Sequence, residues 1–164
     1  LFAHGGLAFT FYNGIMIASL TLAAFLWSPI IHLNEADIPV TLRNIRELFN
    51  GVLVLKDADL TDIIRHAQTY AFTTLGVSQL FHAIGMRNYD KSLFQISHTD
   101  NLAMIGAFSL GLLLQIFVTE FHFLTEIFET SQLSLTEWIN LILLSAVPLL
   151  SHEIIVMGKK LIKK

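Results

Sequence analysis

Four long apolar blocks separated by polar links dominate the pattern of hydrophobic and polar positions along the chain. They cover residues 7–27, 65–86, 101–123 and 138–157. A helix of about 20 residues is about 30 Å long, the thickness of the hydrocarbon core of a bilayer. The pattern therefore predicts an all-α membrane protein whose four transmembrane helices form an antiparallel bundle, as a single domain over residues 1–164.

The first block carries no charged residue. Asn13 is its one strong polar group, and we expect a structural role for it. Trp27 is placed as an interfacial aromatic residue, and Ser28-Pro29 is expected to end the helix.

The segment 32–64 differs in kind, because charged residues are frequent in it and its apolar runs are short. Apolar residues at helical spacing over 42–49, followed by an Asn-Gly pair, predict a short amphipathic helix. Asp59 or Thr61 is expected to cap the helix that comes next. We therefore expect a long, water-exposed outer loop between the first two spans.

The second block is unusual because polar groups lie in the middle of an apolar stretch. On a helix they would occupy adjoining strips of one side, and we expect that side to face other helices or a transported ion, since amides and imidazoles are unfavourable against lipid. The residues are Thr74, Ser78, Gln79, His82 and Gly85. A buried glutamine usually forms an interhelical hydrogen bond, but its carbonyl oxygen can also bind a hard cation such as calcium.

The last two blocks carry fewer polar groups. In the third block, Gly106, Ser109 and Gly111 offer small faces for close helix contact. In the fourth block, Pro148 is expected to interrupt the helix.

The distribution of Lys and Arg predicts the orientation in the membrane. The link after the second block carries Arg87 and Lys91, the end of the chain carries four lysines, and the link 124–136 carries no basic residue. Both termini are therefore expected to be cytoplasmic. The basic residues of the outer loop argue against this orientation, but the last two spans favour it.

Composition narrows the class of protein further. The chain is 54% hydrophobic and only 14% charged, whereas a soluble domain carries about 25% charged residues. A net charge of −3 gives no indication of a nucleic-acid partner, and the absence of cysteine excludes disulfides and thiolate metal sites. The chain begins at Leu1 and has no basic region before its first apolar block, so we expect it to be a piece of a longer protein.

No catalytic or cofactor-binding constellation is apparent. His122 and Glu126 are four residues apart, which would suit a metal, but a metal site needs further donors and an interfacial pair is the simpler interpretation. His152 and Glu153 lack the H-E-x-x-H spacing of zinc hydrolases, and no nucleophile-elbow motif is present.

The stretch TYAFTTLGVSQLFHAIGMRNYDKSLF resembles the C-terminal membrane part of P-type cation-transporting ATPases of the calcium-pump branch. Other pieces agree in order and spacing: LFAHG before the first apolar run, NLAMIGAFSLGLLLQIFVTEF in the third block, and the L-T-E-W start of the last helix. The resemblance covers nearly all of the chain except 33–60, where the outer loop is longer than in the family.

This resemblance implies that the four spans correspond to helices seven to ten of a pump. In that family ATP phosphorylates an aspartate in a D-K-T-G motif, which is absent from this chain. The chain would therefore be inactive alone, with Mg²⁺ and ATP bound elsewhere in the full protein and Ca²⁺ as the transported ion. Helices one to six, the cytoplasmic domains and the lipid bilayer would be its partners.

The resemblance also assigns roles to three side chains. Gln79 matches the ion-site position of the eighth helix, where pumps that move two calcium ions carry an acid. A neutral amide there favours one ion per cycle, as in pumps of the plasma membrane, where we expect this protein. His82 and Glu153 are assigned structural polar roles.

The resulting prediction is the C-terminal membrane domain of an ATP-driven cation pump, which braces the ion-binding helices. The alternative is a free-standing four-helix membrane module, acting as a structural subunit or small channel. A soluble helical bundle is a third possibility and predicts extraction without detergent, but so small a chain has too much apolar surface to cover.

Overall fold

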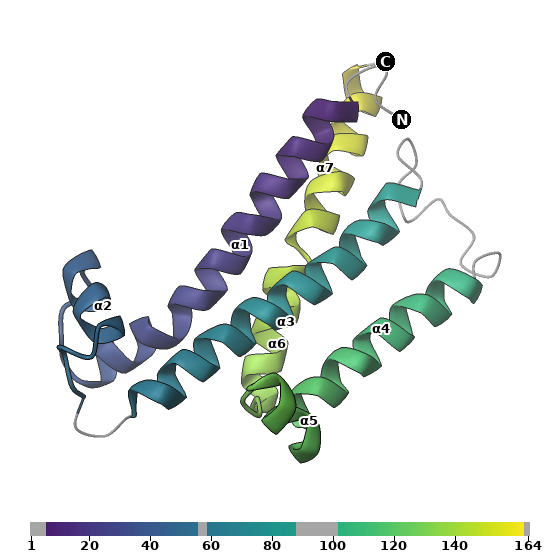
Figure 1. Ribbon diagram of the computed structural model, residues 1–164. Helices are drawn as coiled ribbons and strands as arrows, with labels where there is room; N and C mark the ends of the chain where they lie inside the picture. Colours follow the sequence, from purple (N-terminus) through teal and green to yellow (C-terminus); the bar gives the residue numbers. More distant parts are fainter. Residues whose placement is uncertain (1–5, 56–58, 88–101, 163–164) are drawn as a thin grey trace.

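The computed structural model describes residues 6–55, 59–87 and 102–162, and within these ranges every regular element is a helix. The elements are α1 (Gly6–Glu35), α2 (Leu42–Phe49), α3 (Leu60–Arg87), α4 (Leu102–Glu120), α5 (His122–Phe128), α6 (Leu135–Ser145) and α7 (Val147–Ile162) (Figure 1). The all-α prediction is confirmed for this part of the chain.

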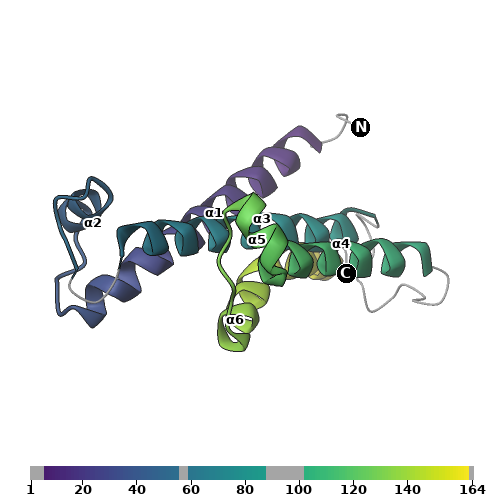
Figure 2. The same cartoon turned by 60° about the horizontal axis from the view of Figure 1, so that its bottom comes forward.

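Helix α3 is the centre of the arrangement. It contacts α1, α4, α6 and α7, and its contact with α1 is the most extensive between any two of the described helices. Helix α4 runs along another side of α3, and α2 lies beside the end of α1 and the start of α3 (Figures 1 and 2). The start of α1 and the end of α7 lie at the same end of the bundle (Figure 1).

Three stretches of the described chain are long and apolar enough to cross a membrane. They are Thr10–Glu35, Leu102–Glu120 and Leu135–Gly158. Helix α3 is long enough but is not among them, because polar side chains occur along its whole length. The expectation of four spans therefore remains a prediction for α3.

The first helix does not end where the sequence suggested. Ser28-Pro29 was expected to stop it, and this is wrong, because α1 continues through Pro29 to Glu35. Packing stabilises the extra turns: the Ser28 hydroxyl donates a hydrogen bond to the Ile63 carbonyl of α3 (3.1 Å), and Leu33 is fully buried. A proline is tolerated inside a helix where neighbouring helices hold the backbone in place.

The described parts of the segment 32–64, residues 32–55 and 59–64, are folded, although most of the segment was expected to be loop. Its ends belong to α1 and α3, and α2 forms over 42–49, as predicted. Thr41 caps α2 by accepting a hydrogen bond from the Asn44 amide (3.1 Å), and Gly51 supplies the positive φ after its end. The buried side chains of this region form one apolar cluster, Leu33, Leu48, Leu55 and Ile63.

The later helices are interrupted at two points. Helix α4 ends at Glu120, and the short α5 follows directly. The predicted interruption near Pro148 is confirmed, because Ala146 separates α6 from α7. Ser134 and Glu137 form a capping box at the start of α6.

The structure does not describe all of the Lys and Arg residues on which the predicted orientation depends. Lys91, Lys163 and Lys164 lie outside the described residues, and so do the side chains of Arg87 and Lys159. The orientation in the membrane therefore remains a prediction.

Candidate functional site on α3

Contrary to the expectation from the sequence, the polar residues of α3 do not share one side. Thr74 and Ser78 are fully buried and Gly85 is buried, whereas Gln79 is exposed and His82 is half-buried. A rotation of about 100° per residue separates Ser78 from Gln79. The polar groups of α3 therefore serve two faces, one turned to other helices of this chain and one open.

The buried face packs against α6 and α7. The Ser145 hydroxyl donates a hydrogen bond to the Thr74 carbonyl (3.4 Å). Farther along, the His152 ring lies over Gly85, so closely that a Cβ at that glycine would lie 3.3 Å from His152 Cγ. Small residues on α3 thus allow polar side chains of α6 and α7 to approach its backbone.

A second contact joins α3 to α4. The Gln115 amide donates a hydrogen bond to the Thr73 hydroxyl (3.2 Å). Leu80 of α3 lies over Gly111, where an added Cβ would be 2.7 Å from Leu80 Cδ2. Gly111 therefore serves the close helix contact that the sequence suggested, whereas Gly106 has no atom within 4 Å of its Cβ position in the described structure.

The open face of α3 is a continuous stripe. Its residues follow one another at helical spacings of three and four, and each is exposed: Gln68, Phe72, Leu75, Gln79, Ala83 and Met86. Within the described chain the Gln79 side chain has no hydrogen-bond partner. An amide offers a carbonyl oxygen that accepts hydrogen bonds or binds a hard cation. We call these six residues the open stripe of α3.

The other residues singled out from the sequence lie apart from this stripe. Asn13 of α1 is 3% exposed and Glu153 of α7 is 7% exposed, so both are buried. The Glu153 carboxylate lies 3.9 Å from His152 Nδ1. His122 and Glu126 form an exposed pair on α5 (3.4 Å).

A complete metal site is not present in the part of the chain that the structure describes. No group of three or more metal-binding His, Cys, Asp or Glu side chains occurs there. Because a hard cation takes several oxygen ligands, Gln79 alone would contribute only one of them.

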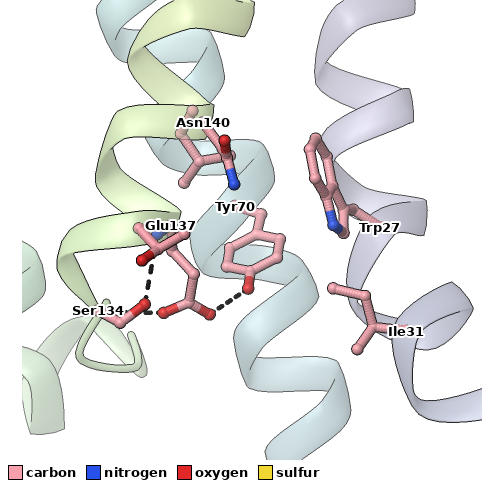
Figure 3. Close-up of a pocket in the computed structure, with 8 residues that line it drawn as sticks. Trp27, Ile31, Tyr70, Ser134, Glu137 and Asn140 are labelled. Carbon is pink, nitrogen blue, oxygen red and sulfur yellow. Dashed lines mark hydrogen bonds between the residues drawn. The ribbon is translucent and has the colours of Figure 1, made fainter. Parts of the chain in front are cut away.

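The sequence reading missed a hydrogen-bonded network where α3 meets α6. The Tyr70 hydroxyl donates to one carboxylate oxygen of Glu137, and the Ser134 amide donates to the other (2.6 Å). The network borders a cavity of about 330 Å³ between α1, α3 and α6 (Figure 3). The S-x-x-E capping pattern was the available signal, but it predicts only the helix start and says nothing of Tyr70.

Residues 1–157 match the family described as "Cation transporting ATPase, C-terminus". The chain is 32% identical over 157 residues to Calcium-transporting ATPase 1 of Bacillus cereus, an alignment that covers 95% of this chain and 16% of that protein. It is 35% identical over 85 residues to the Calcium-transporting ATPase of Bacillus subtilis, which covers 52% of this chain and 9% of that protein.

A plant protein is also similar. Calcium-transporting ATPase 3, endoplasmic reticulum-type, of Arabidopsis thaliana is 31% identical over 91 residues, covering 56% of this chain and 9% of the relative. The chain thus spans less than a fifth of the length of these relatives. Since the family match extends over almost the whole sequence, this chain belongs to the C-terminal family of P-type cation-transporting ATPases.

Proposed function

We propose that the chain is the C-terminal membrane region of an ATP-driven pump whose transported cation is calcium. The observation that carries the proposal is the open stripe of α3, the helix that α1, α4, α6 and α7 all contact. The relatives are named as calcium-transporting ATPases, which supports calcium as the cation. ATP, Mg²⁺ and the phosphorylated aspartate would be bound by other parts of the same pump.

In this proposal the four long segments brace the ion-binding helices. Helix α3 contacts α1, α4, α6 and α7, so its position is held from several directions. Its open stripe combines apolar side chains with two amides, Gln68 near its start and Gln79 near its middle. Other helices of the pump would cover the stripe, because a lipid-facing amide is unfavourable.

Gln79 would then contribute one oxygen to the ion site. A neutral amide adds no charge, which favours one calcium ion per cycle. We assign structural roles to three other polar residues. Asn13 and Glu153 are buried in the bundle, and His82 is half-buried.

The proposed topology places α1, α3, α4 and the α6–α7 pair across the plasma membrane, with both termini in the cytoplasm. It is supported by the common position of the start of α1 and the end of α7 at one end of the bundle (Figure 1). An even number of crossings brings both ends of a chain to the same side.

The test compares two substitutions on the open stripe in the intact pump. Gln79→Ala is expected to raise the calcium concentration for half-maximal phosphorylation by about tenfold, the equivalent of about 1.4 kcal/mol of binding. Leu75→Ala, on the same stripe but without an oxygen, and Asn13→Ala, on another helix, are expected to leave it nearly unchanged. Gln79→Glu is expected to increase the calcium bound per cycle.

Two results would count against the proposal. Equal transport kinetics for the wild type and Gln79→Ala would reduce Gln79 to a packing residue. A protein that contains this chain but has no D-K-T-G motif would instead be a structural subunit or small channel.

A further inference from the structure

A cavity of about 330 Å³ lies between α1, α3 and α6, where Figure 3 shows its side chains. Its volume is in the range of small-molecule sites. Trp27 and Ile31 of α1 form one wall, Tyr70 of α3 lies opposite, and the first turns of α6 complete it. None of these lining residues belongs to the open stripe of α3, so the cavity is separate from the proposed ion site.

The charged side chain that lines the cavity is the acid Glu137. Glu137 is the one ionisable acid or base among the lining residues apart from the phenol of Tyr70, and no Lys or Arg lines it. Tyr70 and the Ser134 amide each donate to a different oxygen of the Glu137 carboxylate, and these two bonds hold it in place. The rings of Trp27 and Tyr70 flank the same space (Figure 3), and aromatic faces attract cations. The lining therefore favours a positively charged group.

The cavity is also amphipathic. Ile31 and Leu141 supply apolar wall, while Thr136 and Asn140 add a hydroxyl and an amide. Leu143 lies almost one turn beyond Asn140 on α6 and is 65% exposed. The surface of α6 next to the cavity is therefore apolar at this position. A matching ligand would have a cationic head beside Glu137, ester groups that hydrogen-bond to Thr136 and Asn140, and an apolar tail beside Leu143.

The position along the helices indicates where such a ligand would come from. Trp27 and Ile31 lie toward the end of the apolar stretch Thr10–Glu35, and an aromatic residue near the end of a span is typical of the membrane interface. Ser134 caps α6, at the start of the apolar stretch Leu135–Gly158. Both place the cavity at the level of lipid headgroups in the proposed topology.

We propose that this cavity binds the headgroup of a zwitterionic aminophospholipid, with its ammonium group beside Glu137 and between the rings of Trp27 and Tyr70. The phosphate esters accept hydrogen bonds from Thr136 and Asn140, and an acyl chain lies along α6 past Leu143. A lipid with an anionic headgroup and no amine brings a negative charge beside Glu137, with no Lys or Arg among the lining residues to offset it, and binds less well.

The test uses the full pump in bilayers of equal parts phosphatidylethanolamine and phosphatidylglycerol. Each lipid is supplied in turn with a photoactivatable group on an acyl chain close to the glycerol, which leaves the headgroup unchanged, and cross-linked peptides are mapped by mass spectrometry. The phosphatidylethanolamine probe is expected to label peptides that contain Trp27 or residues 134–141 at least several-fold more than the phosphatidylglycerol probe.

Two variants and one control make the test specific. Glu137→Gln keeps the size of the side chain and one acceptor oxygen but removes the charge, and it is expected to abolish the difference between the probes. Trp27→Leu removes one ring without touching the hydrogen-bonded network and is expected to reduce labelling by phosphatidylethanolamine. Glu126→Gln neutralises an exposed acid of α5 outside the cavity and is expected to retain the full preference.

Three results would overturn the proposal. These are equal labelling by the two probes in the wild type, a preference that survives Glu137→Gln, and no labelling of these peptides by either probe. The last result would mean that another part of the pump covers the cavity. The Gln79 experiment reads calcium dependence, so the two proposals fail independently.

Discussion

The side chain of Gln115 in α4 lies directly over Gly76 in α3. A Cβ built on Gly76 would be 2.7 Å from Gln115 Oε1, closer than any ordinary contact. From this position the amide of Gln115 donates its hydrogen bond to Thr73, one turn earlier on α3. The glycine therefore makes room for a buried hydrogen bond between a side chain of α4 and a side chain of α3.

Gly76→Ala is expected to destabilise the packing of α4 on α3. The added methyl group would displace the Gln115 amide and weaken its bond to Thr73, and overpacking of this kind costs about 1–3 kcal/mol. The measurement is the thermal unfolding midpoint of the purified pump in detergent. Gly106→Ala on α4, where nothing lies within 4 Å of the added carbon, is the matched control. Equal losses in the two variants would contradict the contact.

Glu120→Ala is expected to loosen the junction between α4 and α6. One oxygen of Glu120 accepts hydrogen bonds from the Trp138 indole (2.8 Å) and from the Leu133 amide (3.2 Å). Leaving part-buried donors without their acceptor costs about 1–3 kcal/mol. The readouts are the unfolding midpoint and the emission spectrum of Trp138.

Glu126→Ala is the control for this prediction. Its carboxylate pairs with the exposed His122, and exposed pairs of this kind contribute about 0–1 kcal/mol. If both substitutions lowered the midpoint equally, the anchoring role of Glu120 would be wrong.

Leu48→Ala is expected to release α2 from the ends of α1 and α3. Leu48 is 1% exposed and packs with Leu33, Leu55 and Ile63, and truncating such a leucine costs about 2–5 kcal/mol. Hydrogen exchange of the α2 amides should accelerate, while the amides of α4 stay protected. Leu42→Ala, at a position that is 87% exposed, should leave exchange unchanged. Unaltered exchange in Leu48→Ala would mean that the cluster does not hold the helix.

The topology can be tested by accessibility, because the chain contains no cysteine. In a cysteine-free background of the whole pump, Val54→Cys and Glu126→Cys are expected to react with a membrane-impermeant maleimide added outside intact cells. Lys164→Cys should react only after the cells are opened. Val54 is 80% exposed, so lack of access would not explain a negative result there. Labelling of Lys164→Cys from outside would exclude cytoplasmic termini.

Local patterns in the sequence were sufficient for the helices themselves. The apolar blocks, the amphipathic segment 42–49 and the break near Pro148 all correspond to observed features. Asp59 accepts a hydrogen bond from the Thr61 amide (3.3 Å), so the cap of α3 was also predictable. These features depend on residues within a few positions of one another, which is why sequence alone determines them.

Features that need a neighbouring helix were not predictable. Pro29 stays inside α1 because α3 and the cluster around Leu33 hold the following turns, and nothing near Pro29 in the sequence indicates this. The cavity brings together Trp27, Tyr70 and Glu137 from three helices, and no spacing along the chain relates them.

The polar residues of α3 show most clearly what the sequence determines and what the tertiary structure determines. The sequence by itself determined that an apolar helix carries Ser78 and Gln79 near its middle. Only the tertiary structure decided that Ser78 is buried and that Gln79 lies on the open stripe. A helix that is apolar on most sides has no face marked for burial by its own pattern, so the neighbours that pack against it decide which side chains are covered.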